Sequence, residues 1–145
     1  MAIEIEIIEG NRMKTIKMVK NIKYGDTEPI KWHPKAIKSE FDCYFCNNLK
    51  DLNGAPKVVN GSFYCSGSKN LEFLEGAPKK VNRNFDCSYC PKLTYPEIIK
   101  GLMNSDIKGN IITDYKNEDP KEDIELARKI GFDKWYKIWK LRKGD

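Results

Sequence analysis

The sequence predicts an α+β protein in which a short repeat solenoid lies between a β-hairpin cap and a helical cap. Residues 41–96 repeat with a period of 22, within the range that is typical of stacked repeat proteins. Residues 2–19 alternate apolar and charged side chains, as the strands of a hairpin do. Residues 95–143 carry helix-starting and helix-ending signals without that period.

The chain of 145 residues is predicted to form a single domain, 1–145, because its length suits one hydrophobic core. We divide it into an N-terminal hairpin cap with a connector (1–33), the repeats (34–95) and a mostly helical C-terminal cap (96–145). The formal net charge is +5, and the excess is spread along the chain. A dedicated nucleic-acid site would concentrate it instead.

The hairpin is predicted from isoleucines that alternate with glutamates before Gly10-Asn11, a two-residue turn. Pairing across that turn gives three predicted pairs: Ile5 with Ile16, Ile3 with Met18, and Glu4 with Lys17. The opposite charges of the last pair support this register. Such a hairpin would cover the apolar end of the first repeat, and the connector at 20–33 has no predicted element.

Three copies of one pattern make up the repeats. The strand segment is Phe41-Asp42-Cys43, then Phe63-Tyr64-Cys65, then Phe85-Asp86-Cys87. A period of two points Phe and Cys to one face of a strand. The later L-x-x-L spacing suits one helical or 3₁₀ turn, and Gly-Ala-Pro leads back to the next strand. One copy cannot bury its apolar side chains alone, so Phe, Cys and Leu are predicted to stack in columns.

The stretches FDCYFCNNLKDLNGAPKVV, FYCSGSKNLEFLEGAPKKV and FDCSYCPKLT resemble the leucine-rich-repeat-like proteins carried by tailed bacterial viruses. The resemblance covers roughly the middle 60 residues and implies a stacked-repeat architecture. It also implies a non-catalytic protein that binds, and blocks, a host enzyme or a bacterial immune component. Repeats of this kind chiefly provide a surface, so the resemblance does not name the target.

After Leu93 the repeat pattern stops, and helices are predicted instead. Thr94-x-x-Glu97 is a possible capping box for a helix at 95–104, and a strand is predicted at 111–113. Asp119-Pro120 begins a helix that ends at Gly131. The last helix, 133–143, places four apolar residues on one side, and lysines occupy the other. Those apolar residues are Trp135, Ile138, Trp139 and Leu141.

The outward positions of the strands are the predicted partner-binding site. One outer column is Asp42, Tyr64 and Asp86, and the next is Tyr44, Ser66 and Ser88, with Phe45 and Tyr89 at the strand ends. Exposed aromatic side chains on a sheet are enriched at protein interfaces. We therefore predict a partner-binding site at Asp42, Tyr44, Tyr64, Asp86 and Tyr89. The alternative is a solvated sheet with tyrosines that bind nothing, since tyrosine is common in strands.

The pairs Cys43-x-x-Cys46 and Cys87-x-x-Cys90 resemble zinc knuckles, but their place in the repeat favours packed thiols. They belong to copies one and three, whose strands would lie roughly 9.6 Å apart. Sulfurs that share one zinc lie within about 4 Å of each other. We therefore predict no metal and no cofactor, and no disulfides. Reduced cysteines, with no signal peptide and no apolar run long enough for a membrane, indicate a cytoplasmic protein.

Two basic regions support a different prediction, a small RNA- or DNA-binding protein. Lys35, Lys57 and Lys79 would form a ladder on the turn edge, joined by Lys80. Trp135 and Trp139 could stack bases if they were exposed. A soluble rim and an amphipathic capping helix explain the same residues, and a structural accessory role in a virus particle is a third possibility. The only histidine is His33, and no common catalytic motif is present, so an enzyme is not predicted.

Overall fold

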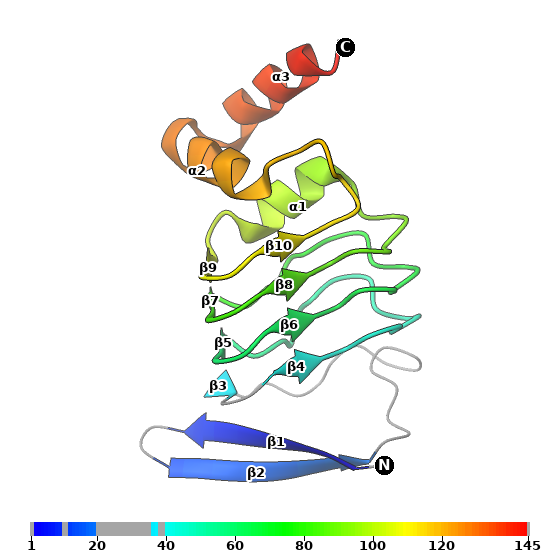
Figure 1. Cartoon of the computed structure of the whole chain (residues 1–145), viewed down its shortest axis with the longest axis vertical. Helices are drawn as coiled ribbons and strands as arrows, with labels where there is room; N and C mark the ends of the chain where they lie inside the picture. Colours follow the sequence, from blue (N-terminus) through cyan, green and yellow to red (C-terminus); the bar gives the residue numbers. More distant parts are fainter. Residues whose placement is uncertain (1, 10–11, 20–35, 38–39, 145) are drawn as a thin grey trace.

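The computed structural model describes residues 2–9, 12–19, 36–37 and 40–144, and the side chains of residues 40–144. The described residues form an α+β fold of two sheets and three helices. Figure 1 shows the strands of the two sheets alternating along the chain, with the β1–β2 hairpin at one end and the helices at the other. The connector at 20–33, with His33, and also Lys35 and the Gly10-Asn11 turn lie outside the described residues.

The first sheet is parallel and has the order β10-β8-β6-β4. Its strands are β4 (Phe41–Asp42), β6 (Phe63–Tyr64), β8 (Phe85–Asp86) and β10 (Ile111–Ile112). Phe41 pairs with Phe63 and Phe63 with Phe85, so the register follows the 22-residue period. Backbone hydrogen bonds continue past the strands, for example from Cys43 N to Tyr64 O at 2.8 Å.

The second sheet has the order β2-β1-β3-β5-β7-β9, and the repeat pattern did not predict it as a sheet. Four of its strands are parallel: β3 (Ala36–Ile37), β5 (Val58–Val59), β7 (Lys80–Val81) and β9 (Asp106–Ile107). The hairpin strands β1 (Ala2–Glu9) and β2 (Arg12–Val19) join it through an antiparallel contact between Ile7 and Ile37. The three predicted hairpin pairs, Ile5 with Ile16, Ile3 with Met18 and Glu4 with Lys17, are confirmed.

The core contains the predicted columns. The Phe63 ring stacks on Phe41 at 5.3 Å and on Phe85 at 5.1 Å between centroids. Val59 and Val81 of the second sheet are also fully buried in the same core. The leucine columns are buried as well: Leu49, Leu71 and Leu93 in one, Leu52 and Leu74 in the other. The single turn predicted between Leu49 and Leu52 was wrong, because Leu52 N donates to Glu75 O of the next copy. The turn lies one step earlier, where Leu49 N donates to Cys46 O, and Leu71 and Leu93 repeat this contact.

The strand stack extends beyond Leu93, where the sequence pattern had predicted its end. Ile107 pairs with Val81, and Ile111 pairs with Phe85, in both cases at a spacing of 26 residues instead of 22. The extra residues accommodate helix α1 (Tyr95–Leu102), which occupies the part of the repeat where Ala55 N donates to Leu52 O, and Ala77 N to Leu74 O, in the earlier copies. A Cβ at Gly101 would lie only 2.4 Å from Leu74 Cβ, so glycine permits this close packing.

The starts of α1 and α2 were predicted correctly and α3 begins one residue earlier than predicted, but one predicted capping interaction is absent. Helix α1 begins after Thr94 with a proline in its first turn, yet the Thr94 side chain forms no capping hydrogen bond. Helix α2 (Pro120–Ile130) is capped as predicted, because Asp119 accepts from Glu122 N at 3.1 Å. It ends at Gly131, whose φ of 93° suits glycine. Helix α3 is Phe132–Arg142.

A buried carboxylate joins the three helices. Asp123 of α2 is 3% exposed and accepts hydrogen bonds from Tyr95 Oη at 2.7 Å, Trp135 Nε1 at 3.0 Å and Arg142 Nη2 at 2.7 Å. Burial alone would raise the pKa of Asp123, but these donors outweigh it and hold the pKa below its usual value. Burial and the hydrogen bond to Asp123 raise the Tyr95 pKa far above its usual range. The sequence analysis did not single out Asp123.

Candidate binding face

The outer surface of the β10-β8-β6-β4 sheet carries the predicted site residues in adjacent rows. Strand pairing places Asp42 beside Tyr64, Tyr64 beside Asp86, and Asp86 beside Ile112. Asp42 is exposed, and Tyr64 and Asp86 are half-buried. The inward neighbours in the same strands are the buried phenylalanines and cysteines, so the alternation predicted for the F-x-C segments is present.

The second outer column differs from the prediction at its two serines. Tyr44 is 41% exposed, and its ring stacks on the Tyr64 ring at 5.2 Å between centroids. Ser66 and Ser88, which were predicted to be solvent-facing, are buried at 5% and 7% exposure. Ser88 Oγ donates to Asp86 Oδ1 at 2.6 Å, which gives it a partner inside the sheet surface.

Left-handed backbone occurs at the same place in all three copies. The φ angles are 53° at Phe45, 73° at Gly67 and 54° at Tyr89. Glycine adopts this conformation at little cost, but an L-residue with a bulky side chain is strained by roughly 1–2 kcal/mol. Phe45 is nevertheless 69% exposed and Tyr89 is 76% exposed. The Phe45 ring lies over Gly67, where an added Cβ would be 2.5 Å from the ring edge.

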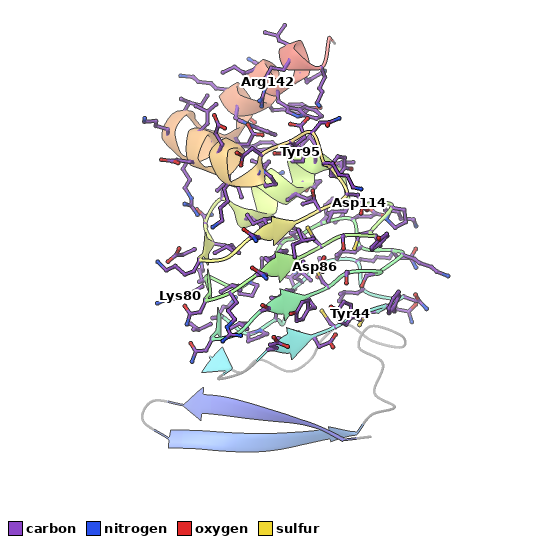
Figure 2. The ribbon with its side chains drawn as sticks, viewed as in Figure 1. Tyr44, Lys80, Asp86, Tyr95, Asp114 and Arg142 are labelled. Atoms are coloured by element: carbon purple, nitrogen blue, oxygen red, sulfur yellow. The ribbon has the colours of Figure 1, made fainter. Side chains whose placement is uncertain are left out.

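We call this surface the acidic aromatic face. Its members are Glu40, Asp42, Tyr44, Phe45, Tyr64, Asp86, Tyr89, Ile112 and Asp114. Figure 2 shows Tyr44, Asp86 and Asp114 on the side of the view towards which the strand arrows point, and Lys80 on the opposite side. Asp114 reaches the face because its Oδ2 accepts from Tyr89 N at 2.8 Å.

All five predicted site residues therefore belong to one surface: Asp42, Tyr44, Tyr64, Asp86 and Tyr89. Sequence reasoning placed Phe45 at a strand end and left it out of the site. It also missed Glu40, Ile112 and Asp114. Asp114 could have been found from strand β10, because a spacing of 26 residues aligns Ile111 with Phe85 of β8.

The five cysteines are free and buried in the core, away from the acidic aromatic face. The Cys43 Sγ donates to Tyr64 O at 3.1 Å, and the Cys90 Sγ donates to Cys65 O at 3.4 Å. Burial raises the pKa of the Cys65 and Cys87 thiols well above the usual value, which keeps them protonated. Within the described residues no group of three or more His, Cys, Asp or Glu side chains is arranged to hold a metal ion.

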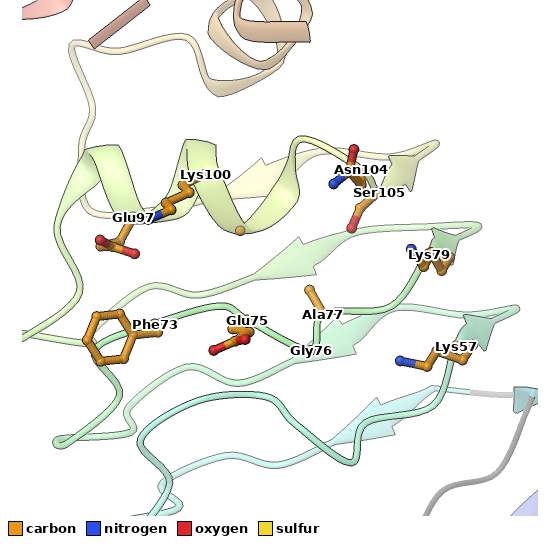
Figure 3. A pocket seen from close by; sticks show the side chains of 11 residues that line it. Lys57, Phe73, Glu75, Gly76, Ala77, Lys79, Glu97, Lys100, Asn104 and Ser105 are labelled. Carbon is orange, nitrogen blue, oxygen red and sulfur yellow. The ribbon is translucent and has the colours of Figure 1, made fainter. Parts of the chain in front are cut away.

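Two lysines of the predicted ladder, Lys57 and Lys79, line a second surface, a groove of about 560 Å³ beside α1, whereas Lys80 is not among the residues that line it. Figure 3 shows Lys57 and Lys79 on neighbouring loops and Lys100 on α1, together with Glu75 and Glu97. Lys79 N donates to Lys57 O at 2.8 Å, so their backbones are fixed next to each other. Two carboxylates among three amines leave little net positive charge, which is unfavourable for a phosphate backbone.

The tryptophans of α3 are packed rather than offered to a ligand. Trp135 is fully buried, and its ring contacts Tyr95 at 6.1 Å and Trp139 at 6.0 Å between centroids. The prediction that Ile138 and Leu141 share the buried side was wrong, because they are 41% and 74% exposed. The helix turns these two side chains to solvent, and the rings of Tyr95 and Phe132 surround Trp135 instead.

No helix in the described part of the chain is both long enough and apolar enough to cross a bilayer. Comparison of the chain with protein-family models, with curated proteins and with solved structures found no match in any of the three.

Proposed function

We propose that this chain is a short leucine-rich-repeat-like solenoid that works as a non-catalytic protein-binding module. The acidic aromatic face is its contact surface. The parallel sheet beneath fixes the side chains in rows, so less conformational entropy is lost when a partner docks. Tyrosine and phenylalanine supply large contact areas with few rotatable bonds.

The observation that carries the proposal is the strained backbone at Phe45 and Tyr89. The corresponding position of the middle copy is Gly67, which shows the residue that this conformation favours. Phe45 and Tyr89 bear the cost of a left-handed backbone and also expose most of an aromatic ring to water. Selection for stability alone would favour neither the strained backbone nor the exposed ring. Recognition of a partner would explain both features.

The resemblance to virus-borne repeats supports a narrower form of the proposal. In that form the chain acts in the bacterial cytoplasm, where it binds and inhibits a host or immune protein. The alternative function is nucleic-acid binding through the predicted ladder of Lys35, Lys57, Lys79 and Lys80. It is disfavoured because the carboxylates of Glu75 and Glu97 share one groove with Lys57 and Lys79. A structural accessory role has no separate observation in its favour.

The test is selection of binders from a displayed library of random 16-residue peptides against the full chain. We expect binders that lose at least tenfold in affinity, about 1.4 kcal/mol, on the double variant Phe45→Ser/Tyr89→Ser. Phe73→Ser is the matched control, because Phe73 is an aromatic residue that is 43% exposed outside the face. Failure to obtain binders, or binders that are equally affected by Phe73→Ser, would reject the proposal.

A further inference from the structure

The acidic aromatic face carries only negative charges, although the whole chain has a positive net charge. The four chain segments that form the face are 40–45, 62–67, 84–89 and 110–115. They contain Glu40, Asp42, Asp86 and Asp114 and no lysine or arginine, although the whole chain has a net charge of +5. Basic residues begin at the ends of these segments, since Arg83 directly precedes the third segment and Lys116 directly follows the fourth. The face is therefore a compact acidic area on a basic protein.

The three aspartates of the face are held in fixed orientations, each by one oxygen. Asp42 Oδ1 accepts from Tyr44 N at 3.0 Å, and Asp114 Oδ2 accepts from Tyr89 N at 2.8 Å. Asp86 Oδ1 accepts from Ser88 N at 3.0 Å and from Ser88 Oγ. Among the described residues no donor occupies the second oxygen of these carboxylates. They are oriented acceptors, which a cationic group can reach without reordering them.

Aromatic rings lie directly beside these carboxylates. Tyr44 stacks on Tyr64 and lies 6.1 Å from Phe45 between ring centroids. The pKa of the Tyr44 hydroxyl is raised, first by burial and then by the negative charges of Asp86 and Asp42. Partial burial and the neighbouring Glu40 likewise raise the pKa of Asp42, although the hydrogen bond from Tyr44 N opposes this. Crowded negative charges of this kind are relieved when a cation binds.

We propose that the acidic aromatic face recognises an arginine-bearing segment of a basic partner protein. This inference rests on the proposed function and specifies the chemistry of the partner. A guanidinium group can lie flat on Tyr44, Tyr64 or Phe45 and at the same time direct its N–H groups at a carboxylate. Lysine offers a point charge without the planar fork, so it fits less well. Nucleic acids and anionic membranes are repelled by the same carboxylates.

The experiment is an NMR titration of the ¹⁵N-labelled full chain with 12-residue peptides in which four arginines alternate with glycine and serine. Matched peptides carry lysine or citrulline in place of arginine. Citrulline keeps the planar shape and removes the charge. We expect amide shifts confined to residues 42–45, 64–67, 86–89 and 112–114. The arginine peptide should bind at least tenfold more tightly than the citrulline peptide, and the lysine peptide should lie between them.

The matched protein variants remove three negative charges in each of two places. Asp42→Asn/Asp86→Asn/Asp114→Asn keeps a carbonyl acceptor for each backbone amide but removes the charges of the three oriented aspartates of the face. It should weaken arginine-peptide binding at least tenfold without lowering the melting temperature. Glu122→Gln/Glu125→Gln/Asp133→Asn removes three charges from α2 and α3, and it should leave the affinity within about twofold, because these charges are remote and screened.

The outcomes separate this inference from the proposed function. If the face variants leave arginine-peptide binding intact, or citrulline binds as well as arginine, the assignment of a basic partner is wrong. Library binders that need Phe45 and Tyr89 but lack basic residues would also overturn that assignment, and they would leave the protein-binding function standing. Dimerisation of the free chain that the triple aspartate variant abolishes would identify the occupant as a second copy, which likewise contradicts the inference.

Discussion

We call β3 to β10 the strand stack and α1 to α3 the helical cap. These two regions bury their side chains by different means. In the stack, like residues lie on like residues, as in the Phe41, Phe63 and Phe85 column, and these contacts are apolar. In the cap, a buried carboxylate, Asp123, accepts three hydrogen bonds from three different residue types. The stack is stabilised mainly by non-directional burial, and the cap depends on directional contacts.

Because of this difference, we expect mutation and pH to change the free energy of unfolding differently in the two regions. Removing apolar volume should harm the stack most, because its rings fill a close-packed interior. Removing charge should harm the cap most, because each donor around Asp123 would lose its acceptor. Substitutions in the two parts therefore test whether the stack depends on apolar volume and the cap on its buried charge.

The largest effect is expected from Phe63→Ala. Phe63 is fully buried between two other rings, so truncation should lower the free energy of unfolding by about 3–5 kcal/mol. Urea unfolding followed by circular dichroism measures this change. Phe73→Ala is the control, and it should cost much less because Phe73 is 43% exposed. Equal losses at the two positions would show that the phenylalanine column does not dominate the stability of the stack.

The second prediction concerns Asp123→Asn. The two carboxylate oxygens accept from different donors, and an asparagine would turn an NH₂ group towards one of them. We expect a loss of about 1.5–3 kcal/mol, the range for hydrogen bonds to charged groups. Unfolding followed by tryptophan fluorescence reports it, because Trp135 donates to Asp123. Asp133→Asn, an exposed change in α3, should have no measurable effect, and a loss as large as that of Asp123→Asn would refute the role of the buried carboxylate.

The third prediction is a pH dependence of opposite sign in the two regions. The folded pKa of Asp123 is lowered, so its contribution is complete above the ordinary aspartate pKa of about 3.9 and is lost as the pH falls through the folded value. The folded pKa of Asp42 is raised, so its protonation favours the folded state, and this contribution is lost as the pH rises through the folded value. Stability curves of Asp123→Asn and Asp42→Asn against pH should therefore deviate from wild type in opposite directions.

The measurement for this prediction is urea unfolding at a series of pH values between about 2.5 and 7, which spans the ordinary aspartate pKa. Asp123→Asn should be less stable than wild type at neutral pH and should approach it in acid. Asp42→Asn should be slightly more stable at neutral pH, and the gain should disappear in acid. Parallel curves for the two variants would mean that the stack and the cap do not differ in their electrostatics.

The columns of the strand stack could be predicted from the sequence, and the contacts among the helices of the cap could not. The phenylalanine and leucine columns recur at a fixed period, and the hairpin register follows from alternation and charge, so both could be predicted. The hydrogen bonds of Asp123 join residues separated by 12, 19 and 28 positions, and no periodic pattern marks such a set. The Ile107 and Ile111 strands were missed as part of the stack because α1 changes the spacing before them.

The candidate site shows the same limit. Alternation along the strands indicated that Asp42, Tyr44 and Tyr64 point outwards, and the structure brings them together on one surface. Alternation does not report how much neighbours cover a small side chain, so Ser66 and Ser88 were predicted to be exposed and are buried. The importance of Phe45 depends on its φ of 53°, a property of the backbone that its residue type gave no reason to expect.

The smallest expected effect is the difference between two substitutions of one residue. Phe45→Gly should be more stable than Phe45→Ala by about 1–2 kcal/mol, because only alanine bears the cost of the left-handed backbone. Denaturant midpoints of the two variants measure this difference. At the exposed helical position Glu125 the order should reverse, since alanine favours a helix over glycine by about 1 kcal/mol. The same order at both positions would show that Phe45 is not strained.

The constant register of β4, β6 and β8 would allow the gene to gain or lose whole repeats without disturbing the strand pairing. Residues 57–78 form a unit of 22 residues, and its two ends adjoin equivalent neighbours in the chain. Unequal recombination between repeats would add or delete one whole unit and lengthen or shorten the outer rows by one strand spacing of about 4.8 Å. A chain with residues 57–78 duplicated should unfold in one cooperative transition, and a second, separate transition would contradict this interchangeability. The length of the outer face would then change in steps of one strand, and each added strand would carry the same residue types at the same positions.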